Sequence, residues 1–148
     1  MNNEPVSPSS GTSQSPLSLS EERQWAMFAH LGVLINLVSG FLGPLVPLII
    51  YMVYKDRSRY VAYQSLQALI FQLIWWVGGG IITGVAWAIT GALSAVVIGI
   101  ICIPFACIIS LVPLAALGYG IYAGTQTSQG LDFKYWLIGD WVRGTLTQ

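Results

Sequence analysis

Charged and apolar positions fall into separate blocks along this chain. Apart from Glu4, the charged residues lie in three short groups, at residues 21–23, 55–59 and 132–143, and residues 24–54 and 60–131 carry no charge. A helix that crosses a bilayer needs about 20 apolar residues. The longer stretch therefore predicts two long membrane helices that meet near residues 91–94. The shorter stretch predicts either a hairpin of two short helices or one kinked helix.

The basic residues favour the hairpin. Lys and Arg collect on the cytoplasmic side of membranes. With four spans, all six Lys and Arg lie on that side, including a basic loop at Lys55, Arg57 and Arg59. With three spans, Arg23 would lie across the membrane from this loop. We therefore predict an all-α membrane protein with four transmembrane helices in two hairpins, the first pair short and the second long, and with both termini cytoplasmic.

Composition agrees with a membrane protein and divides the chain into three parts. Hydrophobic residues make up 55% and charged residues 8%, against about 25% charged in a soluble domain. A soluble enzyme, a nucleic-acid binder and a secreted disulfide scaffold are thereby disfavoured. Residues 1–20 are predicted to be a disordered Ser/Pro-rich tail, 21–131 a four-helix transmembrane domain, and 132–148 an amphipathic aromatic C-terminal segment. This segment is expected to lie on the membrane surface or to dock a partner. Ser18 and Glu21 predict a capping box at the first helix.

Polar residues inside the apolar stretches are the candidate functional residues. In lipid, neutral amides usually bond across helices, and a lone histidine without a carboxylate is a poor proton relay. We predict a polar patch that lines a small groove or holds the helices in register. No enzyme motif, cofactor or metal site is predicted. The patch comprises His30, Asn36, Gln64, Gln67 and Gln72.

Small residues recur four positions apart in the long stretch. Such spacing lets two helix backbones approach closely in a membrane. These positions are predicted to pack the spans of this chain against one another or to form a dimer face. They are Gly80, Gly84, Gly91, Ala95, Gly120 and Gly124.

The opening run from Glu22 to Leu31 resembles the start of the Tic20-like group, small membrane proteins related to a plastid inner-envelope import component. The later motifs that fit the group are Gly43-Pro44, the segment Pro47 to Tyr51, Lys55-Asp56, Tyr60-Val61, the segment Ala68 to Gln72, and the tail from Gly130 to Trp136. The chain departs from the group at Gln64, where the group has His, and at Ile70, where it has Asn. The resemblance implies four helices with both termini on one side and, through the plastid relative, a link to a protein-conducting complex.

Together these features predict a non-catalytic integral protein of the plasma membrane. We expect an accessory or scaffold subunit of a membrane complex, linked to protein insertion or translocation. Its expected partners are the lipid bilayer and other membrane proteins or itself, with no nucleic acid. The alternative is a small homo-oligomeric transporter or channel, which is less favoured because the predicted spans contain no charged residue.

Overall fold

The computed structural model describes residues 15–146, and every regular element in this range is helical. Most of the predicted tail at residues 1–20 lies outside the described residues. The helices are α1 (Leu19–Leu31), α2 (Asn36–Ser39), α3 (Leu45–Tyr54), α4 (Arg59–Gln72), α5 (Gly79–Ser94), α6 (Ile98–Ser128) and α7 (Gly139–Leu146). A 3-10 turn, Gly32–Ile35, joins α1 to α2, and a π-helical stretch, Leu73–Gly78, joins α4 to α5.

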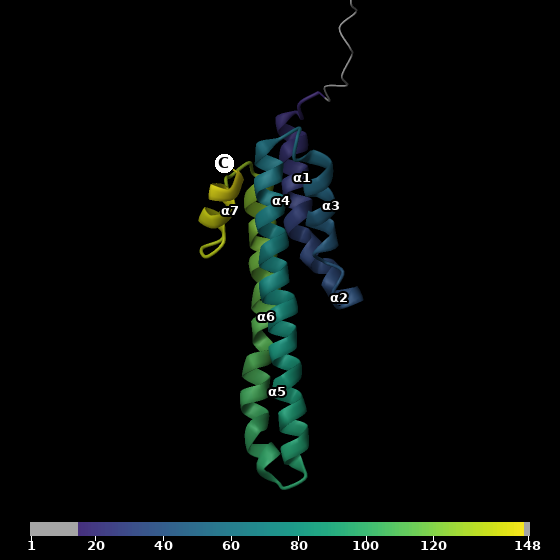
Figure 1. The fold of residues 1–148 in the computed structure, drawn as a ribbon, viewed down its shortest axis with the longest axis vertical. Helices are drawn as coiled ribbons and strands as arrows, with labels where there is room; N and C mark the ends of the chain where they lie inside the picture. The colour runs from purple at the N-terminus through teal and green to yellow at the C-terminus, as the bar shows by residue number, and fades with distance from the viewer. Residues whose placement is uncertain (1–14, 147–148) are drawn as a thin grey trace, which may run out of the picture.

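The long hairpin consists of α4 and α5, which form one path of 36 residues, and α6, which has 31 residues. At 1.5 Å per residue these helices are about 54 Å and 46 Å long. Both are long and apolar enough to cross a membrane. They lie side by side down to the turn that joins them (Figure 1).

Residues 25–54 form a hairpin and not a single kinked helix. The chain descends through α1 and α2, reverses at Gly40, whose φ of 80° suits glycine, and returns through α3. Asn36 Oδ1 accepts a hydrogen bond of 2.7 Å from the Gly43 amide and so closes the turn. Trp76 Nε1 donates to the Gly40 carbonyl at 2.6 Å. The short hairpin therefore ends beside Trp76, about halfway down the long one.

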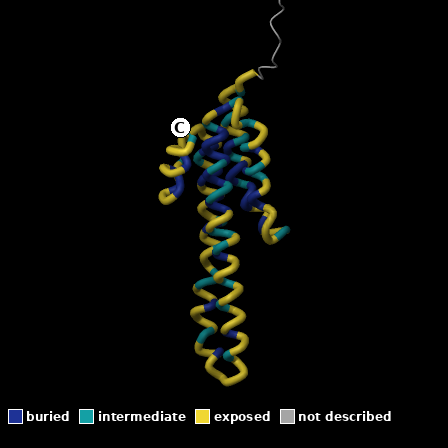
Figure 2. The backbone as a smooth tube through the Cα atoms, viewed as in Figure 1, coloured by how far each residue is buried: buried dark blue, intermediate teal, exposed yellow. Residues whose placement is uncertain are grey.

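This difference in length divides the molecule into two halves. In the first half α1 and α3 pack against α4 and α6, whereas beyond Trp76 only α5 and α6 continue. Buried residues are concentrated in the first half, and most residues of the second half are exposed (Figure 2). The exposed surface of the second half carries large apolar side chains, including Ile81, Val85 and Ile101. Two of the four predicted spans thus have the length of membrane helices, and α3 is shorter, with 10 residues.

Residues of the first two charged groups and the ends of the C-terminal segment meet at one end of the molecule, which we call the charged end. Arg57 Nε donates to the Ser15 carbonyl at 3.1 Å, and the Ser58 hydroxyl donates to the Glu22 carboxylate. Arg59 donates to the carbonyl of Leu146 at 2.9 Å. The N-terminal turn of α1, the basic loop and the end of α7 are therefore linked directly.

Local sequence signals account for the two helix starts at this end. The predicted capping box is confirmed, because Ser18 Oγ accepts from the Glu21 amide while Glu21 accepts from the Ser18 amide. Ser58 caps α4 in the same way by accepting from the Val61 amide at 3.1 Å. Both caps satisfy amides that have no partner within their own helix.

The small residues divide between the two halves. A Cβ on Gly120 would lie 2.9 Å from Val33 Cγ1, and one on Gly124 would lie 3.0 Å from Leu31, so these two glycines let α6 approach the first hairpin. The prediction that small residues pack the spans of this chain together is wrong for the other four positions, because the three glycines meet open space and the alanine is exposed. They are Gly80, Gly84, Gly91 and Ala95.

Candidate functional site

The C-terminal segment folds back along the bundle. After α6, residues 131–138 run down beside α4 in an irregular conformation, and α7 returns towards the charged end (Figure 1). Tyr135, Ile138 and Val142 are buried in this packing. Tyr135 is thus part of the packed core, where its ring stacks on Phe71 with 4.0 Å between ring centroids.

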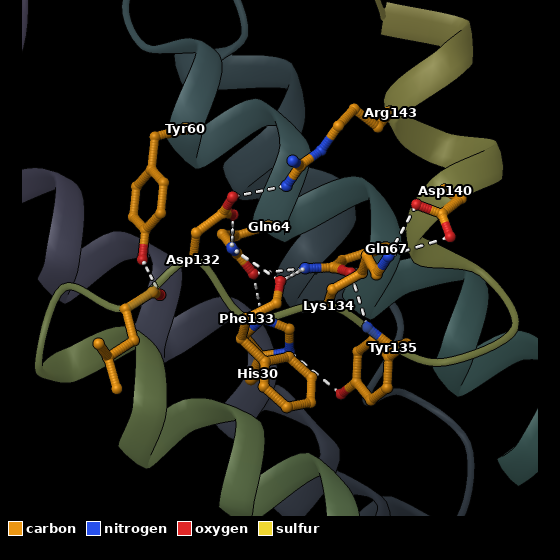
Figure 3. Close-up of polar contacts among 11 residues, drawn as sticks. His30, Tyr60, Gln64, Gln67, Asp132, Phe133, Lys134, Tyr135, Asp140 and Arg143 are labelled. Carbon is orange, nitrogen blue, oxygen red and sulfur yellow. Dashed lines mark hydrogen bonds and ion pairs between the residues drawn. The ribbon is translucent and has the colours of Figure 1, made fainter.

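Three polar side chains of α4 hold this segment through its backbone. Tyr60, Gln64 and Gln67 share one face of α4, and we call them the polar ladder. The Tyr60 hydroxyl donates to the Leu131 carbonyl at 2.9 Å. Gln64 and Gln67 both donate from Nε2 to the Phe133 carbonyl, at 3.1 Å and 2.7 Å (Figure 3).

Gln67 also accepts a hydrogen bond from the segment. Its Oε1 accepts from the Tyr135 amide at 3.2 Å, so one side chain serves both a carbonyl and an amide. These bonds replace the helix or sheet partners that an irregular chain lacks. Buried backbone groups need such partners, since an unpaired one costs about 1–3 kcal/mol.

His30 connects α1 to the ladder and to the segment. Its Nε2 lies 3.0 Å from Gln64 Oε1, and its Nδ1 lies 3.1 Å from the Tyr135 hydroxyl. An amide oxygen only accepts, so Nε2 carries the proton and the Tyr135 hydroxyl donates to Nδ1. Both ring nitrogens are occupied, and the ring is 1% exposed. In this arrangement His30 joins elements together and has no lone pair free to act as a base.

Ion pairs flank the ladder on its exposed side. Arg143 contacts Asp132 at 2.6 Å, and Asp132 in turn accepts from Gln64 Nε2 at 3.2 Å. The hydrogen bond that Arg143 donates to Asp132 raises the pKa of the Arg143 guanidinium, with a further contribution from Tyr63. Lys134 pairs with Asp140 at 2.8 Å. These side chains are roughly half exposed or more, and such pairs usually contribute less than about 1 kcal/mol.

The predicted polar patch is thus divided among three places. His30, Gln64 and Gln67 come together, whereas Asn36 bonds the turn of the short hairpin. Gln72 makes one long bond of 3.4 Å to the Ala29 carbonyl. Its buried Oε1 has no hydrogen-bond partner within residues 15–146.

An apolar groove of about 330 Å³ lies next to the C-terminal segment. Phe71, Trp75 and Tyr119 line one part of it, and Trp136 and Leu137 line another. Sequence reasoning missed this groove and also the roles of Tyr60, Asp132 and Tyr135. A hydroxyl and two amides at residues 60, 64 and 67, on one helix face, are the signal that could have indicated the ladder.

The described ranges contain no cluster of His, Cys, Asp and Glu side chains that could hold a metal ion. The bonds around His30 and the ladder all connect parts of this chain to one another. The fold and the site therefore define a small helical protein with two helices long and apolar enough to cross a membrane, whose buried polar core holds its own C-terminal segment.

A model of the magnetosome magnetite crystal formation protein family, MamF/MmsF, matches residues 21–142. Because the match spans most of the chain, the protein belongs to this family. No curated protein and no solved structure matches the chain.

This result corrects the resemblance drawn from the sequence. The family is not the Tic20-like group, and the expected link to protein insertion or translocation loses its basis. The motifs behind that resemblance are short. Apolar runs separated by a Gly-Pro turn meet requirements that any bilayer imposes, so they do not identify one family.

Proposed function

We propose that this protein is a non-catalytic component of the magnetosome membrane that acts in magnetite crystal formation. Membership of the magnetosome magnetite crystal formation family supports the compartment and the process. The non-catalytic role is supported by the polar core, in which the side chains of His30, Gln64 and Gln67 are used to join elements of the chain. The plasma membrane expected from the sequence is replaced by the magnetosome membrane in this proposal.

We further propose that all four helices cross the bilayer, with both termini on one side. The observation that carries this topology is that the start of α1, the basic loop and the end of α7 meet at one end, because an even number of crossings places them on the same side. The outer face of α3 supports it too, since Ile49, Met52 and Val53 are more than half exposed and apolar.

Topology can be tested with single cysteines at Ser39 and Arg57, after Cys102 and Cys107 are replaced by alanine. Ser39 ends α2 at the turn of the short hairpin, whereas Arg57 lies at the charged end. An impermeant thiol reagent should label these two positions from opposite sides of the membrane. Labelling of both from the same side would overturn the four-span proposal.

The role in crystal formation can be tested in cells that form magnetite. Removal of the protein should change the size or number of crystals seen by electron microscopy, and the unaltered chain should restore them. Crystals that are unchanged without the protein would sink the proposal. Homo-oligomeric transport, the alternative from the sequence, remains a prediction.

A further inference from the structure

The tip of the C-terminal segment exposes two large apolar side chains between buried neighbours. Trp136 is 82% exposed and Leu137 is 62% exposed, whereas Tyr135 and Ile138 on either side are 2% and 5% exposed. The buried neighbours anchor the tip, so its two side chains are held outwards. Exposure of two large apolar side chains to water is unfavourable, so another apolar surface is expected to cover the tip.

The position of the tip along the bundle indicates that the bilayer covers it. Gln67, which bonds the Tyr135 amide, lies eight residues beyond Arg59, or about 12 Å down α4. The tip lines a groove with Phe71, which lies about 18 Å down the same helix. A headgroup layer is only about 5–7 Å thick on each side. With the charged end at the headgroups, the tip reaches the hydrocarbon of the adjacent leaflet.

The ladder meets part of the requirement for irregular backbone at this depth. Within the hydrocarbon, non-helical chain is tolerated only where the protein satisfies its polar groups. The carbonyls of Leu131 and Phe133 and the amide of Tyr135 have their partners on α4. The chain turns back after the tip through bonds from the Ile138 and Gly139 amides to the Tyr135 carbonyl.

The charges next to the tip are compatible with insertion. Lys134 precedes the tip and Asp140 follows it, and the two are paired with each other at 2.8 Å. Neither residue is therefore an isolated charge, and side chains that are 45% and 77% exposed belong at the headgroup boundary, above the inserted tip. The path of the chain agrees, since residues 131–138 run away from the charged end before α7 returns to it (Figure 1).

We propose that residues 131–146 form a re-entrant hairpin whose tip, Trp136 and Leu137, is inserted in the hydrocarbon of the leaflet at the charged end. The partner of this surface is lipid. The inference rests on the membrane placement of the short hairpin in the proposed function.

Fluorescence quenching at single cysteines tests this placement. In the background without Cys102 and Cys107, a polarity-sensitive fluorophore is attached at Leu137→Cys, at Ile49→Cys on the outer face of α3, or at Asp56→Cys in the basic loop. The full chain is reconstituted in phosphatidylcholine–phosphatidylglycerol vesicles. Quenchers are lipids brominated in the acyl chain and iodide on both sides of the membrane. We expect Leu137 to behave like Ile49, with strong bromine quenching and at least fivefold weaker iodide quenching than Asp56.

The outcomes separate this inference from the proposal on which it rests. Iodide quenching of Leu137 at the level of Asp56, with Ile49 still in lipid, overturns the inserted tip and leaves the four-span proposal intact. Iodide access at Ile49 as well overturns that proposal too. A Leu137 label shielded from both quenchers means that a second copy or another protein covers the tip, and this also overturns the inference.

A second variant tests what holds the tip. Gln67→Leu removes the bond to the Tyr135 amide and should raise iodide quenching at Leu137 at least twofold. Gln72→Leu changes the same residue type on the same helix without touching the segment, and it should leave quenching unchanged. Equal quenching in the two variants would show that the ladder does not hold the tip.

Discussion

The replacement Gln67→Leu should release the C-terminal segment while leaving the four-helix half folded. Gln67 is fully buried, and its side chain makes one bond to the Phe133 carbonyl, one to Gln64 and one to the Tyr135 amide. Leucine has a similar size, so the substitution removes hydrogen bonds without opening a large cavity.

The expected cost follows from the bonds that are lost. Interhelical polar bonds in membranes contribute about 0.6 kcal/mol each, so three bonds amount to about 2 kcal/mol. The Tyr135 amide also loses its partner, and an unpaired buried donor costs about 1–3 kcal/mol. Phe133 keeps one bond, from Gln64 at 3.1 Å. Because the segment can relax, we expect a total of about 2–4 kcal/mol.

Gln72→Leu provides a matched control. Gln72 is buried on the same helix, but it makes a single 3.4 Å bond and its Oε1 has no hydrogen-bond partner within residues 15–146. Replacing a poorly satisfied polar group by an apolar one of similar size is nearly neutral or stabilising. The control should change stability by less than about 0.5 kcal/mol.

Two measurements check this pair of variants. Unfolding in mixed micelles, followed by circular dichroism, gives the free energy of unfolding. Trypsin cleavage after Lys134 reports release of the segment, because the protease needs the local chain to open. Cleavage should accelerate in Gln67→Leu and stay at the wild-type rate in Gln72→Leu. Equal destabilisation and equal cleavage in both variants would refute the role of the ladder.

Three further predictions concern the helix starts, the glycines and the far turn. Ser58→Ala should lower the free energy of unfolding by about 1–2 kcal/mol, because it removes the cap of α4 and a bond to α1. A smaller loss than that of an exposed serine-to-alanine control would contradict the capping role of Ser58. Gly120→Ala should lower the free energy of unfolding by about 1–3 kcal/mol, because the added methyl group overpacks against the first hairpin. Gly84 faces open space, so Gly84→Ala should raise the free energy of unfolding by up to about 1 kcal/mol. Loss of a cross-linked oligomer in Gly84→Ala would instead indicate a dimer face. Val97 has a left-handed φ of 68°, so Val97→Gly should stabilise by about 1 kcal/mol in thermal unfolding, and Val96→Gly should not.

Short-range features of this fold could be predicted from the sequence. The two charge-free stretches predict two helical hairpins, and glycine and proline between residues 40 and 47 predict the turn of the first. The spacing of Ser18 and Glu21 predicts the capping box. Each of these signals acts over a few residues or through one apolar stretch, so the local pattern contains it.

Long-range features could not be predicted in this way. The ladder joins residues 60–67 to residues 131–135, and no periodicity links segments so far apart. The same limit applies to the glycines, since spacing by four describes Gly80 and Gly120 equally well, although only Gly120 meets another helix. What distinguishes them is the length of the first hairpin, which ends beside Trp76.

The polar core has a physical reason in the membrane setting. Lipid is as apolar as leucine, so burial of apolar side chains gives little drive for helices to associate there. Close packing at Gly120 and Gly124 brings the first hairpin against α6, and the directional hydrogen bonds of His30 and the ladder fix how these helices are oriented. These polar bonds lie in the half of the molecule where α1, α3, α4 and α6 meet and the C-terminal segment returns. Beyond Trp76 only α5 and α6 continue, and both expose large apolar side chains, as a surface that faces lipid would.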